Sequence, residues 1–471
     1  MNTIFNRQAK GLLTLVLCLF IGTSVSAQQL RTSYFMQNSP LRTAQNPAFR
    51  PERGYVSIPV LGGVNAAYTT NGVALDNILF SKDGRLVTFM DKSVNTESFL
   101  SGLKDRNQVN TDFGTQILSG GWYAGKGFYS VDISVKGLAS IGVPKNMLEF
   151  VKRGNTVAGT TYDITNMKAY SEAYVEAGVG YSRPITDKLT VGGKLKMLFG
   201  AGTMEAQIDH LHAVMNENNW EITSQGTMSA NVKGLTAENS YDDQGRQYIS
   251  GFQYDSPGLG GFGMGIDLGA TYQLLDNLTL SASVLDLGFI SWNKSSNIYG
   301  EVNGQFDFDG FDLALGDKVD GSKPSMSDQF DTMKGNLEQL FHFTQKDPVK
   351  NTTSLRSTIN IGAEYRILDN QLGFGLLSST RFYTPKAYSE LTASVSYRPV
   401  YWFEAAASYS FIHSNFKTYG LALNFTPKWI NFFIGSDYMF TKVTPQFLPV
   451  SGSAVNLYMG ISVPLRNMMC D

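Results

Sequence analysis

Apolar and polar side chains alternate along many stretches of this chain. In the last stretch one face carries Val455, Leu457, Met459, Ile461 and Val463. The residues between them are Asn456, Tyr458, Gly460 and Ser462. Residues 128–136 and 359–366 repeat the pattern. A period of two indicates β-strands that place one apolar face against a core or against lipid.

The length of these stretches separates the two environments. Alternation persists through residues 169–183, 189–208 and 278–292. Soluble strands average about 5–6 residues, whereas a tilted strand that crosses a membrane needs about 9–11. The chain is therefore predicted to be all-β: a transmembrane antiparallel β-barrel with lipid outside and polar residues in the lumen, rather than a soluble sandwich.

Six short turns are predicted to form the periplasmic edge. Each combines Pro, Asp-Asn or Gly with a nearby aromatic residue suited to an interfacial girdle. They lie near residues 125–127, 183–188, 274–277, 367–370, 397–399 and 425–429. The other connections are mostly longer (residues 71–110, 142–168, 209–257, 293–352 and 444–452, with brief ones near Pro385 and Asn415) and would face outside.

The turns also give a strand count. Six hairpins supply twelve strands, and residues 54–69 and 454–465 bring the number to 14, with 16 as the alternative. Hairpins at residues 220–232 and 298–308 must then lie in the external loops, and short loop helices are expected at residues 145–153 and 326–343. The predicted divisions are a signal peptide (1–27), an N-terminal hatch or plug (28–53), the barrel (54–465) and a C-terminal tail (466–471).

The N-terminus indicates export. Arg7 and Lys10 precede an apolar run, and Val25-Ser26-Ala27 is a small-residue cleavage site, which predicts cleavage near Ala27. Removing these two from the 38 basic residues leaves 36 against 40 acidic ones, so no basic excess points to nucleic acid. Charged residues are only 17% and aromatic residues 12%, which suits a barrel in the bacterial outer membrane, in contact with its lipid.

The segment just before the first strand is not patterned as a helix or a strand, yet it is too apolar for a free tail. Because the six short turns are predicted to be periplasmic and the strand count is even, the first strand also begins on the periplasmic side. The segment before it can therefore enter the lumen from that side as a hatch. Its predicted plug residues are Tyr34, Phe35, Met36, Arg42, Asn46, Pro47, Ala48, Phe49 and Arg50.

The strand phase also predicts which charged side chains point into the lumen. They are Asp132, Lys136, Glu172, Glu176, Lys194, Lys196, Glu364, Arg366, Arg381, Glu390, Arg398, Glu404 and Asp437. Both signs occur, whereas an ion-selective pore can show a ring of one sign. The mixture favours a packed lumen with paired charges, and Arg31, Arg42 and Arg50 can supply further partners.

The chain resembles known barrels. The early Asn46-Pro47-Ala48, the 14 strands and hairpins such as residues 265–272 are similar to FadL-type barrels and to PorV/PorP-like outer-membrane proteins. Residues 31–36, 46–55 and 86–92 resemble more closely a Bacteroidetes-type barrel family of unknown function. The FadL-type resemblance implies an N-terminal hatch and passive uptake of hydrophobic molecules. The end of the chain departs from many such barrels, since Leu465 is followed by six further residues rather than closing on an aromatic one.

Catalytic chemistry finds little support, and we expect no enzyme, no cofactor and no metal. There is no Gly-x-Ser-x-Gly elbow, and a strand rather than a helix follows the glycines of residues 258–263. His210 and His212 share a strand face near Asp209 and Glu205, but such a pair is more typical of solvated residues. A pairing of Ser410 or Ser414 with His413, and calcium binding by the acidic loop of residues 307–320, are disfavoured in the same way.

Two functions follow as hypotheses. The first is a passive conduit for small hydrophobic molecules, gated by the N-terminal plug. The alternative is a non-enzymatic partner or structural subunit of an envelope or secretion complex, with other envelope proteins as partners. An apolar cavity that reaches the wall would favour the first, and a filled lumen with a large external surface would favour the second.

Overall fold

The computed structural model describes residues 30–70, 79–82, 85–91, 93–153, 159–216, 219–242, 244–308, 338–382, 387–412, 416–439 and 454–465. The predicted signal peptide, the C-terminal tail, His413 and nearly all of the acidic loop lie outside these residues.

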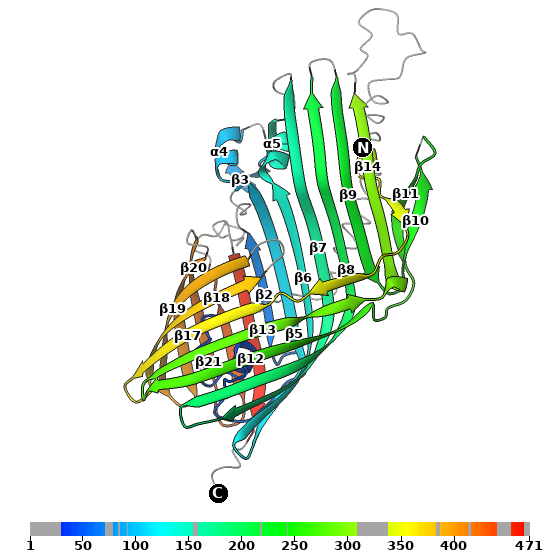
Figure 1. Ribbon diagram of the computed structural model, residues 1–471. Helices are drawn as coiled ribbons and strands as arrows, with labels where there is room; N and C mark the ends of the chain where they lie inside the picture. The colour runs from blue at the N-terminus through cyan, green and yellow to red at the C-terminus, as the bar shows by residue number, and fades with distance from the viewer. Residues whose placement is uncertain are drawn as a thin grey trace, which may run out of the picture.

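Fourteen strands close into an antiparallel barrel, as predicted, and not sixteen (Figure 1). In chain order the wall consists of β1 (Tyr55–Ser57) continued by β2 (Val64–Thr70), β5 (Arg106–Ala124), β6 (Gly127–Pro144), β7 (Thr160–Pro184), β8 (Leu189–Met215), β12 (Gly261–Leu275), β13 (Leu278–Trp292), β17 (Thr358–Ile367), β18 (Leu372–Phe382), β19 (Ala387–Val400), β20 (Phe403–Ile412), β21 (Phe416–Phe425), β22 (Asn431–Ser436) and β23 (Ala454–Pro464). The first strand closes the ring by pairing with the last, with Tyr55 opposite Pro464 and Val64 opposite Met459.

All six predicted turns connect paired wall strands at one end of the barrel. They contain two to five residues, and Gly125 and Asn370 adopt positive φ angles of 57° and 66°, which glycine and asparagine tolerate. The Leu465 N–H donates to the Gly54 carbonyl at 2.7 Å, so the wall begins and ends on this side.

The wall has charged residues inside and apolar residues outside. Leu195 and Met197 are 67% and 52% exposed, while Lys196 between them is 4% exposed. The same inversion occurs at Ile361, which is 60% exposed, and Glu364, which is 8% exposed. A soluble protein would bury the apolar set, whereas lipid makes the exposed set favourable. The chain is therefore a membrane-spanning barrel.

Two wall strands are far longer than a membrane requires. β7 has 25 residues and β8 has 27, so they continue through parts of the predicted loops 142–168 and 209–257. Beyond the barrel they are joined by β9 (Trp220–Val232), β14 (Asn297–Phe308) and β15 (Thr344–Lys346), and we call this part of the sheet the external sheet (Figure 1). Residues 220–232 and 298–308 lie outside the barrel wall, as predicted, but they form two strands that pair with each other rather than two separate hairpins.

An apolar cluster explains why the external sheet stays ordered. One of its faces buries Tyr162, Ile164, Leu211 and Phe306, and the helix α5 (Lys145–Arg153) packs against it. Helix α5 has the predicted bounds, whereas most of the second predicted loop helix lies outside the described residues.

The remaining described elements are short. They are α2 (Arg42–Gln45), β3 (Leu79–Lys82), β4 (Arg85–Thr88), α4 (Thr96–Ser101), β10 (Leu235–Tyr241), β11 (Gln247–Tyr254), η1 (Lys294–Ser296) and β16 (Asn351–Ser354). Among the helices of the described residues, none has the length and apolar character needed to cross a membrane.

Candidate functional site

Residues 30–53, which we call the hatch, contact wall strands all around the ring. Asn46 reaches β12 and β13, Arg366 of β17 binds the Phe35 carbonyl, and Glu404 of β20 binds Gln37. A single short segment can touch strands on so many sides only from within the ring. The hatch therefore lies in the lumen.

The Asn46-Pro47-Ala48 motif fits against the wall through side-chain hydrogen bonds and two glycines. Asn46 Oδ1 accepts from the Ala48 N–H at 2.9 Å, and Asn46 Nδ2 donates to the Ala282 carbonyl at 3.1 Å. Gly192 and Gly269 are paired on β8 and β12 directly beneath the motif. A Cβ on either glycine would collide with residues 46–48, so the close approach requires glycine.

Aromatic residues of the hatch pack against the neighbouring part of the wall, between β13 and β18. The ring centroids of Tyr34 and Phe35 lie 4.9 Å apart, and those of Tyr34 and Phe49 lie 5.0 Å apart, both edge to face. All three rings are buried with Leu377 of β18. The Tyr34 hydroxyl lies 3.3 Å from Ser281 Oγ, and burial raises the pKa of this tyrosine.

A second apolar contact joins the hatch to the last four strands of the wall, β20 to β23. It is formed by Leu30, Met36 and Leu41 of the hatch with Ala406, Ala422, Phe433 and Tyr458 of β20 to β23. Each of these side chains is at most 6% exposed, so displacement of the hatch would leave an apolar surface inside the barrel.

Charged groups of the wall hold the hatch backbone. Glu404 accepts from the Gln37 N–H at 3.0 Å and from the Asn38 N–H at 3.4 Å. Asp437 accepts from the Thr32 N–H at 2.8 Å, and Arg366 donates to the Phe35 carbonyl at 2.9 Å. These bonds satisfy backbone groups that would otherwise be buried without partners.

The hatch arginines differ in their partners. Arg31 forms an ion pair with Glu390 of β19. Arg42 lies over the Phe49 ring, 4.5 Å from its centroid, and donates to the Gln37 carbonyl at 3.3 Å. Burial lowers the pKa of Arg42, although Glu364 and Glu404 oppose this shift. Arg50 instead points to the turn between β5 and β6, where it donates to the Lys126 carbonyl at 3.5 Å.

The largest charged cluster lies on β6, β7, β8, β12 and β13. Glu176 is its centre, with Lys136 Nζ at 2.6 Å and Lys194 Nζ at 3.0 Å. Lys196 Nζ lies 2.6 Å from Asp267 Oδ1 and 2.6 Å from Asp286 Oδ1. Asp132 completes the cluster through Lys194 at 2.8 Å. Three cations thus face four carboxylates in the lumen.

The other predicted lumen charges form no ion pair with this cluster among the pairs described. Glu364 pairs with Arg366 at 2.8 Å, and Arg398 pairs with Glu52 where the hatch meets the first strand. Glu172 accepts a hydrogen bond from the Tyr170 hydroxyl at 2.7 Å. Arg381 lines a small cavity.

Sequence reasoning missed Asp267 and Asp286. Asp267 shares the lumen phase of β12, so the period of two could have identified it. Asp286 has a φ of 55° at an irregularity in the β12–β13 pairing, which changes the strand phase. Its N–H donates to Asp267 Oδ1 at 2.7 Å, and no sequence pattern signals this contact.

Small cavities lie between the described residues of the hatch and the wall. Of three cavities beside the hatch, one holds about 90 Å³ and is lined by charged residues that include Asp112, Lys136, Asp286, Arg356 and Arg381. The others hold about 50 and 20 Å³. For comparison, an apolar cavity that admits benzene has about 150 Å³. Each of these three cavities is smaller than that.

No curated protein matches the chain. Among solved structures, the Pseudomonas putida toluene transporter TodX is 10% identical, with 94% of each chain covered and a TM-score of 0.39. A Pseudomonas aeruginosa FadL homologue is 10% identical, with 94% of this chain and 98% of that chain covered and a TM-score of 0.46. The translocator domain of the autotransporter NalP from Neisseria meningitidis is 6% identical, with 94% and 100% covered and a TM-score of 0.31. These values are too low to support a conclusion about substrate.

A family model gives the stronger relationship. Residues 47–437 match the model described as a family of unknown function, DUF5723. The match covers the end of the hatch and nearly the whole wall. The barrel therefore belongs to the DUF5723 family, as the sequence predicted when it indicated a barrel family without an assigned activity.

Proposed function

We propose that this protein is a non-catalytic conduit of the outer membrane, closed by its hatch and opened when the hatch moves. The observation that carries the proposal is the hatch inside a closed ring. The hatch enters from the end of the barrel where the short turns lie, and it is joined to the wall at β1. It can therefore shift without breaking any strand pair.

Small hydrophobic molecules are the cargo that the lumen favours. If the hatch moved away from the wall, Ala406 and Phe433 would lose their apolar contacts with Leu30, Met36 and Leu41. An apolar molecule can replace the lost contact, since burial of its surface is favourable by about 25 cal/mol per Å². The charged cluster has both signs and presents no one-sign ring for an ion to follow.

A reversible cross-link between hatch and wall tests the proposal. Thr32 Oγ1 and Ser408 Oγ lie 2.7 Å apart, so cysteines at these positions can form a disulfide with a small adjustment. The double variant Thr32→Cys/Ser408→Cys is made with Cys470→Ser and expressed in cells that lack their own hydrophobic-uptake barrels. Uptake of the uncharged dye phenylnaphthylamine across the outer membrane is then followed by fluorescence. We expect oxidation to reduce uptake to the level of cells without the protein, and reductant to restore it.

The matched control cross-links two wall strands. Thr380 Oγ1 and Ser389 Oγ lie 3.0 Å apart on β18 and β19 and are directly paired. A disulfide there should form equally well and leave dye uptake unchanged. If the unlocked protein carries no dye, or if locking the hatch has no effect on uptake, the conduit is refuted.

The external sheet supports a second candidate function, that of a partner subunit in an envelope complex. Its solvent face rises above the barrel on one side (Figure 1) and is formed by polar residues such as Glu221, Thr223, Gln305 and Asp307. Purification in mild detergent followed by mass spectrometry tests this function. An envelope protein recovered with the wild type, and lost when charge-reversed residues replace Glu221 and Asp307, would support it.

A further inference from the structure

Two histidines and one aspartate converge on the solvent face of the external sheet. His210 and His212 lie on β8, two residues apart, so their side chains project from the same face. Asp163 on β7 is paired directly with His212. The sequence alone had drawn attention to the histidines, but their carboxylate partner lies 47 positions earlier and is brought beside them by the β7–β8 register.

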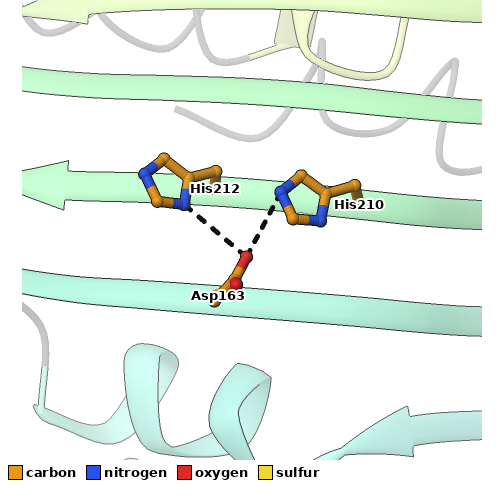
Figure 2. Close-up of side chains that lie close together, drawn as sticks. All are labelled: Asp163, His210 and His212. Carbon is orange, nitrogen blue, oxygen red and sulfur yellow. Dashed lines mark ion pairs between the residues drawn. The ribbon is translucent and has the colours of Figure 1, made fainter.

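The three side chains point at one another (Figure 2). Asp163 Oδ1 lies 3.2 Å from His210 Nε2 and 3.5 Å from His212 Nδ1. The two imidazole rings are parallel, with centroids 6.0 Å apart. One ligand atom from each residue lies within 4.8 Å of the other two, and among the described residues no other group of three His, Cys, Asp or Glu side chains meets this condition.

These spacings suit a bound cation. Zinc bonds to imidazole nitrogen and carboxylate oxygen at about 2.0–2.2 Å, which places neighbouring ligands of a tetrahedron roughly 3.4 Å apart. Both distances from Asp163 agree with this value. Two imidazoles with one carboxylate form a donor set that binds zinc and related divalent transition metals rather than calcium or magnesium.

The surroundings favour a cation over a simple ion pair. The positions paired with the two histidines on β9 are Thr223 and Gln225, both neutral. The exposed Asp209 precedes His210 and adds negative charge nearby. The Asp163 backbone is also fixed, because Asn146 of α5 donates to its carbonyl at 3.1 Å. The position of one ligand is thus set by the packing of the helix.

We infer that Asp163, His210 and His212 form a binding site for a divalent transition metal, of which zinc is the representative. The side chains of these residues are 61%, 44% and 40% exposed, so a metal held by them keeps at least one coordination position open to the outside. Water fills that position in the isolated protein, and a side chain of an external partner can replace it. The metal would also link β7 to β8 above the membrane.

Metal titration of the full mature chain tests the site. The protein is purified in detergent without a polyhistidine tag, and zinc is titrated by calorimetry in competition with a chromophoric chelator. We expect one zinc per chain. Asp163→Ala, His210→Ala and His212→Ala should each weaken binding by about tenfold or more, since even supporting residues of metal sites have effects of that size.

Matched controls keep the test specific. Thr223→Ala and Gln225→Ala alter the same face beside the histidines and should leave zinc affinity unchanged. Heat-modifiable migration on gels shows that every variant is folded. Electron paramagnetic resonance with Cu²⁺ gives an independent readout, with two coordinated nitrogens in the wild type and one in His210→Ala. Failure of the wild type to bind one zinc, or unchanged binding in His210→Ala/His212→Ala, would overturn the assignment.

Discussion

Glu404 is the wall residue whose loss should free the hatch most directly. Its carboxylate is 1% exposed and accepts from the backbone N–H groups of Gln37 and Asn38. A hydrogen bond to a charged group contributes about 1.5–3 kcal/mol, so Glu404→Ala should destabilise the seated hatch by about 3–6 kcal/mol. Since about 1.4 kcal/mol is a tenfold change in an equilibrium constant, hatch opening should become roughly 10²- to 10⁴-fold more frequent.

Hydrogen exchange measures this opening. The variant is placed in lipid nanodiscs, and mass spectrometry follows deuterium uptake in peptides from residues 30–50. Faster exchange there, with unchanged exchange in β12 and β13, is the expected result. Glu404→Gln keeps an acceptor oxygen and should lie between wild type and Glu404→Ala.

A control at the mouth of the barrel separates anchoring from general charge loss. Glu52 pairs with Arg398, and its side chain is 48% exposed, so Glu52→Ala should change hatch stability by only about 0–1 kcal/mol. Equal exchange of residues 30–50 in wild type and Glu404→Ala would refute the reasoning that backbone hydrogen bonds to the wall hold the hatch.

Three further predictions concern the lumen and the external sheet. Lys196→Met removes one of three cations from a buried cluster with four carboxylates and should lower the free energy of unfolding in urea by about 3–5 kcal/mol. The control Lys168→Met breaks a partly exposed ion pair with Glu205 and should lower it by only about 0–1 kcal/mol. Similar losses for the two variants would contradict the prediction. Gly375→Ala should destabilise the barrel by about 1–3 kcal/mol in a thermal melt through overpacking, since the new Cβ would lie closer than 3.0 Å to the Phe35 ring. The control is Gly142→Ala, whose Cβ would meet only a carbonyl at 3.8 Å. The reasoning fails if the two variants are equally destabilised. Burial lowers the pKa of His342 in the external region. The unfolded state therefore binds the proton more readily, and stability is lost as pH falls below about 6.5. The protection factors of the β11 amides, which correct exchange for its intrinsic dependence on pH, should decrease from pH 7.5 to pH 5.5 (roughly the range in which histidine titrates), and a decrease of the same size in His342→Gln would contradict the reasoning.

The barrel wall could be predicted because its signals are local. A period of two, an aromatic residue and a turn with Pro, Asp-Asn or Gly recur at each hairpin, and every one of the six turns could be located. The extension of β8 into the external sheet could not, because the alternation changes phase at an irregularity between Ile208 and His210. Residues 220–232 and 298–308 could be predicted as β structure outside the wall, but their pairing with each other could not.

The lumen contacts show a second limit. Strand phase placed Lys194 and Lys196 on the same face, and both belong to the charged cluster. Asp286 was not predicted to face the lumen, because its positive φ changes the phase of β13. The partnership of Asp163 with the two histidines depends on register between different strands, which a single sequence does not reveal.

The pairing of the first strand with the last has a consequence for assembly. The hatch is joined to β1, and β1 is held between β5 and β23. The hatch also contacts Asp437 and Tyr458, which come late in the sequence. Residues near the start of the described chain therefore depend for their native contacts on residues about 400 positions later, which makes folding depend on very long loop closures. Seating of the hatch and closure of the barrel between β1 and β23 would then both be late events in folding.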